Sequence, residues 1–192
     1  MRHLPAWLRL LLSLVVVPSV AFAQPAPDII LTDFSEPDLA ERWRAVNDDV
    51  MGGRSTGGPE FVESRLVFSG STNVVGGGFS SIRTGADGWD GAEAIVLRVR
   101  GDGRRYEVDV QTGERAGFFP VAYRAAFEAP AEWTVIRLPV DAFAATARGE
   151  PVAARPFDPA RARTVGLYIF DGESGPFRLE VDWIGLDMAE AE

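Results

Sequence analysis

The stretch RRYEVDVQ at residues 104–111 decides the fold class of this chain. Its apolar residues Tyr106, Val108 and Val110 alternate with charged or polar neighbours. A strand with one buried side and one solvent-facing side has this period of two, because successive side chains point to opposite faces of a sheet. We therefore predict a half-buried strand here, with its aromatic and valine side chains turned toward a core.

The same alternation returns in PFRLEVDWIGL at 176–186, and the residues expected to point inward there are Phe177, Leu179, Val181 and Trp183. Further short runs also read as strands, at 63–70, 77–84, 93–101, 132–139 and 164–171. Helical periodicity is confined to 34–43 and 139–149, each able to carry a turn or two. Short strands between turn residues, with 20 glycines in the chain, predict an all-β fold, a sandwich of two antiparallel sheets.

The first 23 residues are typical of a secretory signal peptide. Arg2 and Arg9 flank the start of an apolar run at 10–17, and AFA at 21–23 is the small-x-small pattern of a signal peptidase site. The run is well short of the roughly 20 residues that a membrane-spanning helix needs. We expect export to the periplasm, removal of the signal, and a single soluble β-sandwich domain at 24–192.

The composition excludes several kinds of chemistry. The 19 basic residues are all arginine, and the 17 outside the predicted signal stand against 28 acids, leaving a net charge of about −11 that disfavours nucleic acid and anionic membranes as partners. The chain has no cysteine and no lysine, and its only histidine, His3, lies in the predicted signal. Histidine-based triads, Schiff bases and zinc sites with imidazole or thiolate ligands are therefore excluded from the mature chain. We predict no catalytic residue, no cofactor and no metal site.

Two acidic turns invite other interpretations. DGESGP at 171–176 could offer oxygens to calcium, but it lacks the twelve-residue spacing of a recognised calcium loop, so an ordinary hairpin is favoured. The turn at 100–104, RGDGR, is likewise typical of a hairpin, because Asp-Gly is a common turn dipeptide.

A polar, glycine-rich segment, VNDDVMGGRS at 46–55, lies between the strand-like run WRAV and the predicted strand at 63–70. Its glycines permit a positive φ, and Asn47 and Asp48 can bond to their own backbone, so the segment reads as a structured loop. The carboxylates could simply satisfy loop amides, as short polar side chains commonly do in turns. Asp48 and Asp49 cannot act as a catalytic pair on one bond if adjacent side chains point to opposite sides.

Several blocks in a fixed order give the chain a resemblance to a known family. They are VNDDVMGGRS at 46–55, GGFSSIRT at 77–84, VRGDGRRY at 99–106, WTVIRLP at 133–139, VGLYIFD at 165–171 and GPFRLEVDWI at 175–184. In this order they resemble the complex I intermediate-associated protein 30 family over about 34–184. The resemblance implies a galactose-binding-like jelly roll, and mitochondrial members of that family are assembly chaperones for respiratory complex I. It carries no catalytic assignment.

The resemblance also implies a set of signature positions. Beyond those proposed below for binding, it includes Trp43, Val50 and Gly101. Glycine mixed with Asp, Arg, Asn and an aromatic side chain suits a shallow polar recognition surface. We therefore predict a binding surface made of Asn47, Asp48, Asp49, Met51, Gly52, Gly53, Ser55, Gly77, Gly78, Phe79, Arg83, Arg100, Asp102, Gly103 and Tyr106.

Alternatives stay open at this point. Arg83 or Arg100 could instead form a structural ion pair with Asp48, Asp49 or Asp102. The tryptophans at 43, 133 and 183 are expected to fill the core, since each falls in a strand-like run. For function, we predict a non-catalytic binding or assembly factor for a membrane-associated protein partner in the envelope or respiratory chain. A periplasmic carbohydrate-binding module that takes a saccharide is the alternative, and a carboxylate-dependent glycosidase is a third.

Overall fold

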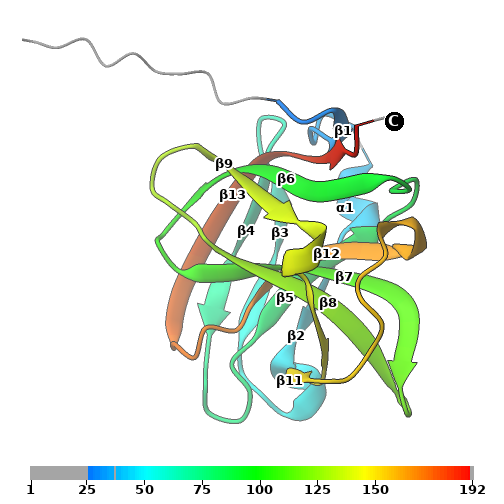
Figure 1. Cartoon of the computed structure of the whole chain (residues 1–192). Coiled ribbons are helices and arrows are strands. Elements are labelled where there is room, and N and C mark those ends of the chain that lie inside the picture. The colour runs from blue at the N-terminus through cyan, green and yellow to red at the C-terminus, as the bar shows by residue number, and fades with distance from the viewer. Residues whose placement is uncertain (1–25, 37, 191–192) are drawn as a thin grey trace, which may run out of the picture.

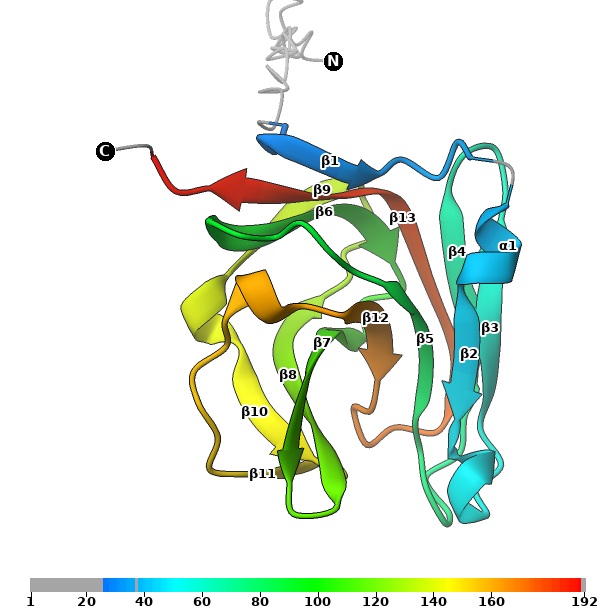
Figure 2. The same ribbon diagram turned by 90° about the vertical axis from the view of Figure 1, so that its right-hand side faces the viewer.

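A computed structural model describes residues 26–36 and 38–190, without the side chains of residues 50 and 51. The predicted signal peptide at 1–23 lies outside these described residues. Two antiparallel sheets pack face to face, as Figures 1 and 2 show from two directions. The predicted all-β sandwich is therefore confirmed.

The first sheet has six strands, in the order β3-β4-β13-β6-β9 with β1 also paired to β13. Strand β13 is the longest, and β4 pairs with its first half while β1 pairs with its second. The six strands are β1 (Ile29–Thr32), β3 (Thr56–Phe61), β4 (Leu66–Thr72), β6 (Ala92–Gly101), β9 (Thr134–Pro139) and β13 (Gly175–Met188).

The second sheet has seven strands, in the order β11-β10-β8-β7-β12-β5-β2. The seven are β2 (Arg44–Asn47), β5 (Ser80–Gly85), β7 (Arg105–Ala116), β8 (Phe119–Glu128), β10 (Ala144–Ala147), β11 (Glu150–Pro151) and β12 (Thr164–Ile169). Helical structure in the described residues is limited to single turns, namely α1 (Leu39–Arg42) and the 3-10 turns η1 (Asp48–Met51), η2 (Val140–Ala142) and η3 (Pro159–Arg161). None of these helices is long and apolar enough to cross a membrane.

The core lies between the two sheets and follows the alternation seen in the sequence. Tyr106, Val108 and Val110 of β7 are all at most 1% exposed and join the central apolar cluster. Leu167 of β12 and Ile82 of β5 lie in the same cluster. The intervening residues of these strands point away from the core, so the outer face of the seven-stranded sheet is free to carry other side chains.

Two of the three tryptophans expected in the core lie elsewhere. Trp43 is 4% exposed and fills the core as predicted. Trp183 does not, because the register of β13 against β6 shifts between Val181 and Trp183, and a one-residue bulge transfers the inward positions to Ile184 and Leu186.

Trp133 lies outside the core as well. It precedes β9 on the outer face of the six-stranded sheet, where the guanidinium groups of Arg98 and Arg100 lie 5.0 and 4.8 Å from its ring centroid.

The expected helical turn at 139–149 is also only partly right, since η2 gives way to strand β10. Strand β8 was missed by the sequence prediction, although its core positions alternate like those of β7.

Candidate binding cleft

The first two signature blocks meet at the buried carboxylate of Asp48. This side chain is fully buried, and it accepts hydrogen bonds from the Ser55 amide at 2.8 Å, the Ser55 hydroxyl at 2.6 Å and the Gly78 amide at 2.6 Å. Gly53 and Gly77 pack against it so closely that an added Cβ would lie 2.1 and 2.4 Å from atoms of the carboxylate. We call this arrangement the Asp48 knot, and it joins η1 to the loop before β5.

The knot has an electrostatic consequence. Burial raises the pKa of Asp48, but the hydrogen bonds from Ser55 and Gly78 outweigh this effect and keep the pKa below its ordinary value. Asp49, the next residue, is exposed. The two carboxylates thus point to different environments.

The other residues of the first block serve the same loop. Asn47 accepts a hydrogen bond from the Ser80 hydroxyl at 2.6 Å and donates one to the Gly57 carbonyl. Gly52 ends η1 with a φ of 85°, and its amide donates a hydrogen bond to the backbone carbonyl of Asp49. The side chain of Met51 lies outside the described part of the structure.

The third signature block lies at the turn between β6 and β7. Asp102 accepts hydrogen bonds from the Tyr106 hydroxyl and from the amide of Arg178, and burial raises the pKa of Tyr106 far above its ordinary value. Gly103 is exposed in this turn with a φ of 82°. Arg100 pairs with Glu180 at 2.8 Å on the outer face of the six-stranded sheet, so its carboxylate partner is none of the three proposed from sequence.

A hydrogen-bond network connects this turn to the Asp48 knot. Arg104 donates to both carboxylate oxygens of Asp171, at 2.8 and 2.6 Å, and to the hydroxyl of Thr72 at 3.0 Å. The amide of Asn73, the next residue, donates to Ser55 of the knot. The three blocks are therefore linked by one polar network.

A cleft of about 360 Å³ crosses the outer face of the seven-stranded sheet. The loop before β5 forms one wall, and the residues after β10 and at the start of β8 form another. In Figure 2 the tip of the β7–β8 hairpin and η1 lie at the same lower end of the sandwich. The lining residues are Val46, Gly77, Phe79, Arg83, Gln111, Pro120, Ala122, Arg124, Thr146, Arg148, Gly149, Tyr168 and Phe170.

Gly77, Phe79 and Arg83 are the residues of the predicted binding surface that line this cleft. The Asp48 knot fixes the loop that carries Gly77 and Phe79, so several signature positions support the cleft wall from behind. Arg100 lies on the other sheet, and Tyr106 faces the core.

A row of charged side chains runs along and beneath the cleft, and its carboxylate lies under the lining residues. Asp109 of β7 is 1% exposed and accepts a hydrogen bond from Arg124 of β8 at 2.8 Å. Arg83 of β5 approaches the same carboxylate from the other side, with 3.8 Å between its Nε and Asp109 Oδ1. Gly166 lies between Arg83 and Asp109 in the register, and a Cβ there would meet the Arg83 side chain at 2.8 Å. The glycine therefore leaves room for Arg83 to reach across β12.

Aromatic rings pack beside this row. Tyr168 stacks on Phe79 with centroids 5.4 Å apart, and the Arg124 guanidinium lies 3.7 Å from the Tyr168 ring centroid. Tyr168 is 4% exposed, and burial raises the pKa of its hydroxyl. Burial lowers the pKa of Arg124, but the charges of Asp109, Tyr168 and Glu107 and the hydrogen bond to Asp109 together outweigh this effect and raise the pKa above the ordinary value.

One exposed phenylalanine lines the cleft, and two more lie on the neighbouring β7–β8 hairpin. Phe118 at the tip of the β7–β8 hairpin is 90% exposed, and its neighbour Phe119 is 45% exposed. Phe170 at the end of β12 is 48% exposed and lines the cleft directly. Arg148, after β10, lies over the ring of Phe119 at 5.0 Å.

Sequence reasoning missed Asp109, Arg124 and Tyr168. The alternation in RRYEVDVQ places Asp109 on the side of the strand that faces away from the core. This could have suggested Asp109 as a site residue, because a carboxylate there on a central strand needs a cationic or hydrogen-bonding partner. Nothing local marks Arg124 or Tyr168, since their proximity arises from the pairing of β8, β7 and β12.

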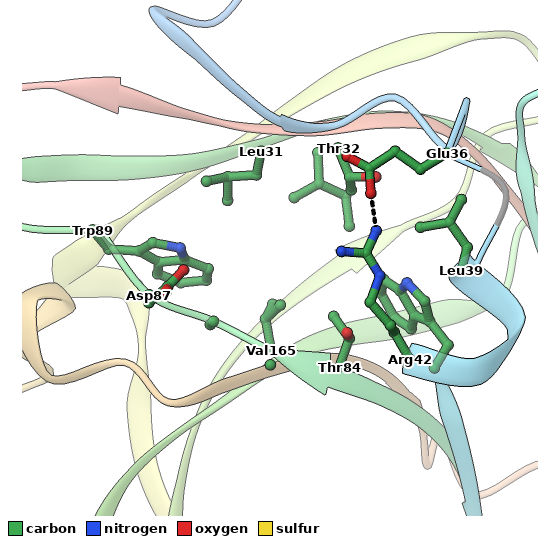
Figure 3. A pocket seen from close by; sticks show the side chains of 13 residues that line it. Leu31, Thr32, Glu36, Leu39, Arg42, Thr84, Asp87, Trp89 and Val165 are labelled. Atoms are coloured by element: carbon green, nitrogen blue, oxygen red, sulfur yellow. Dashed lines mark hydrogen bonds and ion pairs between the residues drawn. The ribbon is translucent and has the colours of Figure 1, made fainter.

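A second cavity of about 180 Å³ lies at the other end of the sandwich, beside α1. Figure 3 shows Trp89, Thr84 and Val165 around it, with the ion pair between Arg42 and Glu36 drawn across one side. The part of the chain that the structure describes holds no cluster of three acidic or histidine side chains suited to a metal ion.

Comparison with known proteins identifies the relatives of this chain. The family model described as complex I intermediate-associated protein 30 matches residues 32–181. The mitochondrial complex I intermediate-associated protein 30 of Drosophila melanogaster is 24% identical over 199 residues, which cover 88% of this chain and 66% of that protein. The chain thus spans just under two thirds of this relative's length.

Solved structures share the fold at low identity. The family 11 carbohydrate-binding module of the cellulase Lic26A-Cel5E of Clostridium thermocellum has a TM-score of 0.59 at 14% identity, covering 86% of this chain and 97% of that one. The agarase AgWH50C has a TM-score of 0.55 at 12% identity, covering 85% of this chain and 25% of that one. These likenesses concern the fold alone. Since the family match covers most of the sequence, the chain belongs to the complex I intermediate-associated protein 30 family.

Proposed function

We propose that this protein is a non-catalytic binding and assembly factor that holds a segment of a partner protein in the cleft on its seven-stranded sheet. The partner is a membrane-associated complex of the envelope or the respiratory chain, and the family's name supports an assembly role. The observation that carries the proposal is the basic, aromatic cleft, with exposed Phe170 in its lining and exposed Phe118 and Phe119 on the neighbouring β7–β8 hairpin.

Exposed phenylalanines favour a protein ligand. Large apolar side chains gathered on one surface are typical of protein interaction sites, because their contact with water is unfavourable until a partner covers them. Aromatic and arginine side chains are also the residues that contribute most at protein interfaces.

A carbohydrate-binding role is the second candidate, favoured by the half-exposed ring of Phe170 beside the polar cleft floor. Sugar stacking needs an open aromatic face. The Tyr168 ring does not offer an open face, because Phe79 stacks on it and the Arg124 guanidinium lies over it. The geometry therefore supports a protein ligand better than a saccharide.

A glycosidase role has less support. It requires two carboxyl groups on either side of the scissile bond. Glu107 and Asp109 do share the outer face of β7, and burial raises the pKa of Glu107. However, both are neighbours on one strand, and Arg124 approaches both at 3.9 and 2.8 Å. They form an ion-pair cluster on one side of the cleft.

The proposed location is the periplasm, on the strength of the signal-like residues 1–23. Fractionation of cells that produce the tagged protein tests this location directly. Recovery of a shortened protein in the periplasmic fraction is expected, whereas a full-length cytoplasmic protein would contradict it.

The binding proposal is tested by recovering the tagged protein from gently solubilised native membranes and identifying what accompanies it. The informative variant is Phe118→Ser/Phe170→Ser, which removes exposed apolar groups without touching the core. Val62→Ser is the matched control, because Val62 is 47% exposed but lies at the turn between β3 and β4.

We expect a defined membrane complex with the parent and with Val62→Ser, and its loss with the double variant. Circular dichroism must show that all three proteins are folded. If no complex accompanies the parent protein, the assembly role is wrong, and a rise in Tm with mixed-linkage glucan oligosaccharides would then support the saccharide alternative.

A further inference from the structure

The cleft has a charge opposite to that of the protein as a whole. The chain carries 28 acids against 19 basic residues. Among the residues that line the cleft, however, Arg83, Arg124 and Arg148 are charged and none is acidic. The carboxylates of Asp109 and Glu107 lie beside Arg83 and Arg124 and offset part of this charge, so the remaining positive excess rests mainly on Arg148. Such a local positive excess within an acidic protein favours an anionic group on the ligand.

Arg83 and Arg148 have N–H donors to offer to a ligand. Arg124, by contrast, is committed to Asp109 through the 2.8 Å hydrogen bond from its Nε. Arg83 lies 3.8 Å from the same carboxylate, too far for a hydrogen bond, and its Nε has no hydrogen-bond partner among the described residues. The side chain of Arg83 as a whole is 25% exposed and lines the cleft, so its N–H groups other than the buried Nε are the ones that can meet a ligand.

Arg148 supplies the second guanidinium group with N–H donors available to a ligand. It is exposed, it lies over the ring of Phe119, and it forms no ion pair with any described carboxylate. Its φ of 55° falls in the left-handed region, which disfavours residues other than glycine. The turn after β10 thus holds an arginine beside the cleft in a backbone conformation that glycine would adopt more easily.

Apolar groups surround these cations. Val46, Phe79 and Phe170 line the same cleft, and Pro120 and Ala122 complete its apolar part. A volume of about 360 Å³ lies at the small end of the roughly 300–1,000 Å³ found for ligand pockets, which suits the side chains of a short segment.

We propose that the cleft recognises a carboxylate carried next to apolar side chains, namely an aspartate or glutamate flanked by aromatic or aliphatic residues in an exposed segment of the partner protein. The carboxylate meets the guanidinium groups of Arg83 and Arg148, and the flanking groups pack on Phe79 and Phe170. Arginine suits this task because its planar fork matches the geometry of a carboxylate. This inference rests on the proposed function and specifies the chemistry of its partner.

Three end-blocked peptides test the proposal in titrations of the purified, isotope-labelled protein followed by NMR. They are Gly-Phe-Asp-Leu-Gly, its Asn counterpart and its Lys counterpart, so that only the central charge changes. The protein variants are Arg83→Gln/Arg148→Gln and, as control, Arg54→Gln, which removes an exposed arginine that does not line the cleft.

We expect the Asp peptide to bind about tenfold more tightly than the Asn peptide, because charge-assisted hydrogen bonds are roughly twice as strong as neutral ones. This preference should fall to about twofold or less in the double variant and persist in Arg54→Gln. If Arg83→Gln prevents folding, Arg148→Gln alone must reduce the preference, since Arg148 is exposed. Equal affinity for the three peptides, or no binding by any, would overturn the proposal.

The two proposals fail in different ways. If a membrane complex depends on Phe118 and Phe170 but the protein shows no preference for the Asp peptide, the assembly role is supported and the recognition of a carboxylate is refuted. A clear preference for the Asp peptide without any recovered complex retains the recognition chemistry and removes the assembly role.

Discussion

Replacement of Asp48 by alanine tests whether this signature residue stabilises the fold or meets a ligand. The variant removes an acceptor of three hydrogen bonds, from the Ser55 amide, the Ser55 hydroxyl and the Gly78 amide. Each buried donor left without a partner costs about 1–3 kcal/mol, so with incomplete additivity the free energy of unfolding should fall by about 3–5 kcal/mol. For a domain of this size such a loss lowers the Tm by about 6–20 °C.

The assay is urea denaturation followed by tryptophan fluorescence, because Trp43 and Trp89 are buried in the core and report its exposure. Asp49→Ala is the matched control. Asp49 has the same charge, is exposed, and should change the free energy of unfolding by no more than about 0.5 kcal/mol. A loss below about 1 kcal/mol in Asp48→Ala, or an equal loss in both variants, would refute the structural role of Asp48.

The remaining predictions concern the same network and its pH dependence. Gly77→Ala should lower the free energy of unfolding by about 1–3 kcal/mol, because its Cβ would lie 2.4 Å from the Asp48 carboxylate, whereas Gly85→Ala, with nothing within 4 Å, should have little effect in the same urea assay. Arg104→Lys should cost about 2–4 kcal/mol, because lysine cannot reproduce the forked bonds to the loop after β12, while Arg105→Lys, whose side chain is 63% exposed, should stay within about 0.5 kcal/mol. Since folding lowers the pKa of Asp48 from its ordinary value of 3.8, the stabilisation from its ionised form is present above that value and is lost as the pH falls through the folded-state pKa. Acid titration of stability should therefore show a larger loss below about pH 4 in the parent than in Asp48→Asn, and parallel curves would contradict this assignment.

The sequence predicted the strands whose alternation is local and regular. The runs at 104–111 and 164–171 became β7 and β12, because period-two patterns report directly which face a residue occupies. The alternation in 176–186 was interrupted at 182, where a bulge exchanged the inward and outward positions of β13. Such a bulge depends on how β13 meets β6, which no local pattern records.

For the candidate site, the sequence identified the right segments but could not separate their roles. Asp48 and Arg83 are both signature positions, and the sequence does not distinguish them. In the structure, Asp48 is fully buried within a loop, whereas Arg83 lines the cleft. Burial decides between these roles, and it depends on neighbours that are distant in the chain. Residues 77–83 combine both roles, since Gly77 packs on Asp48 while Phe79 and Arg83 line the cleft.

By itself, the sequence determined the all-β class, the family resemblance, and the exclusion of histidine, cysteine and lysine chemistry from residues 24–192, because these depend only on residue identity and short-range order. Only the tertiary structure decided where the cleft lies. Asp109, Arg124 and Tyr168 come from three different strands, and their side chains meet because antiparallel pairing sets them in adjacent rows on one face. A site of this kind is a property of strand order and register, which are fixed when the whole core packs and not by any one segment.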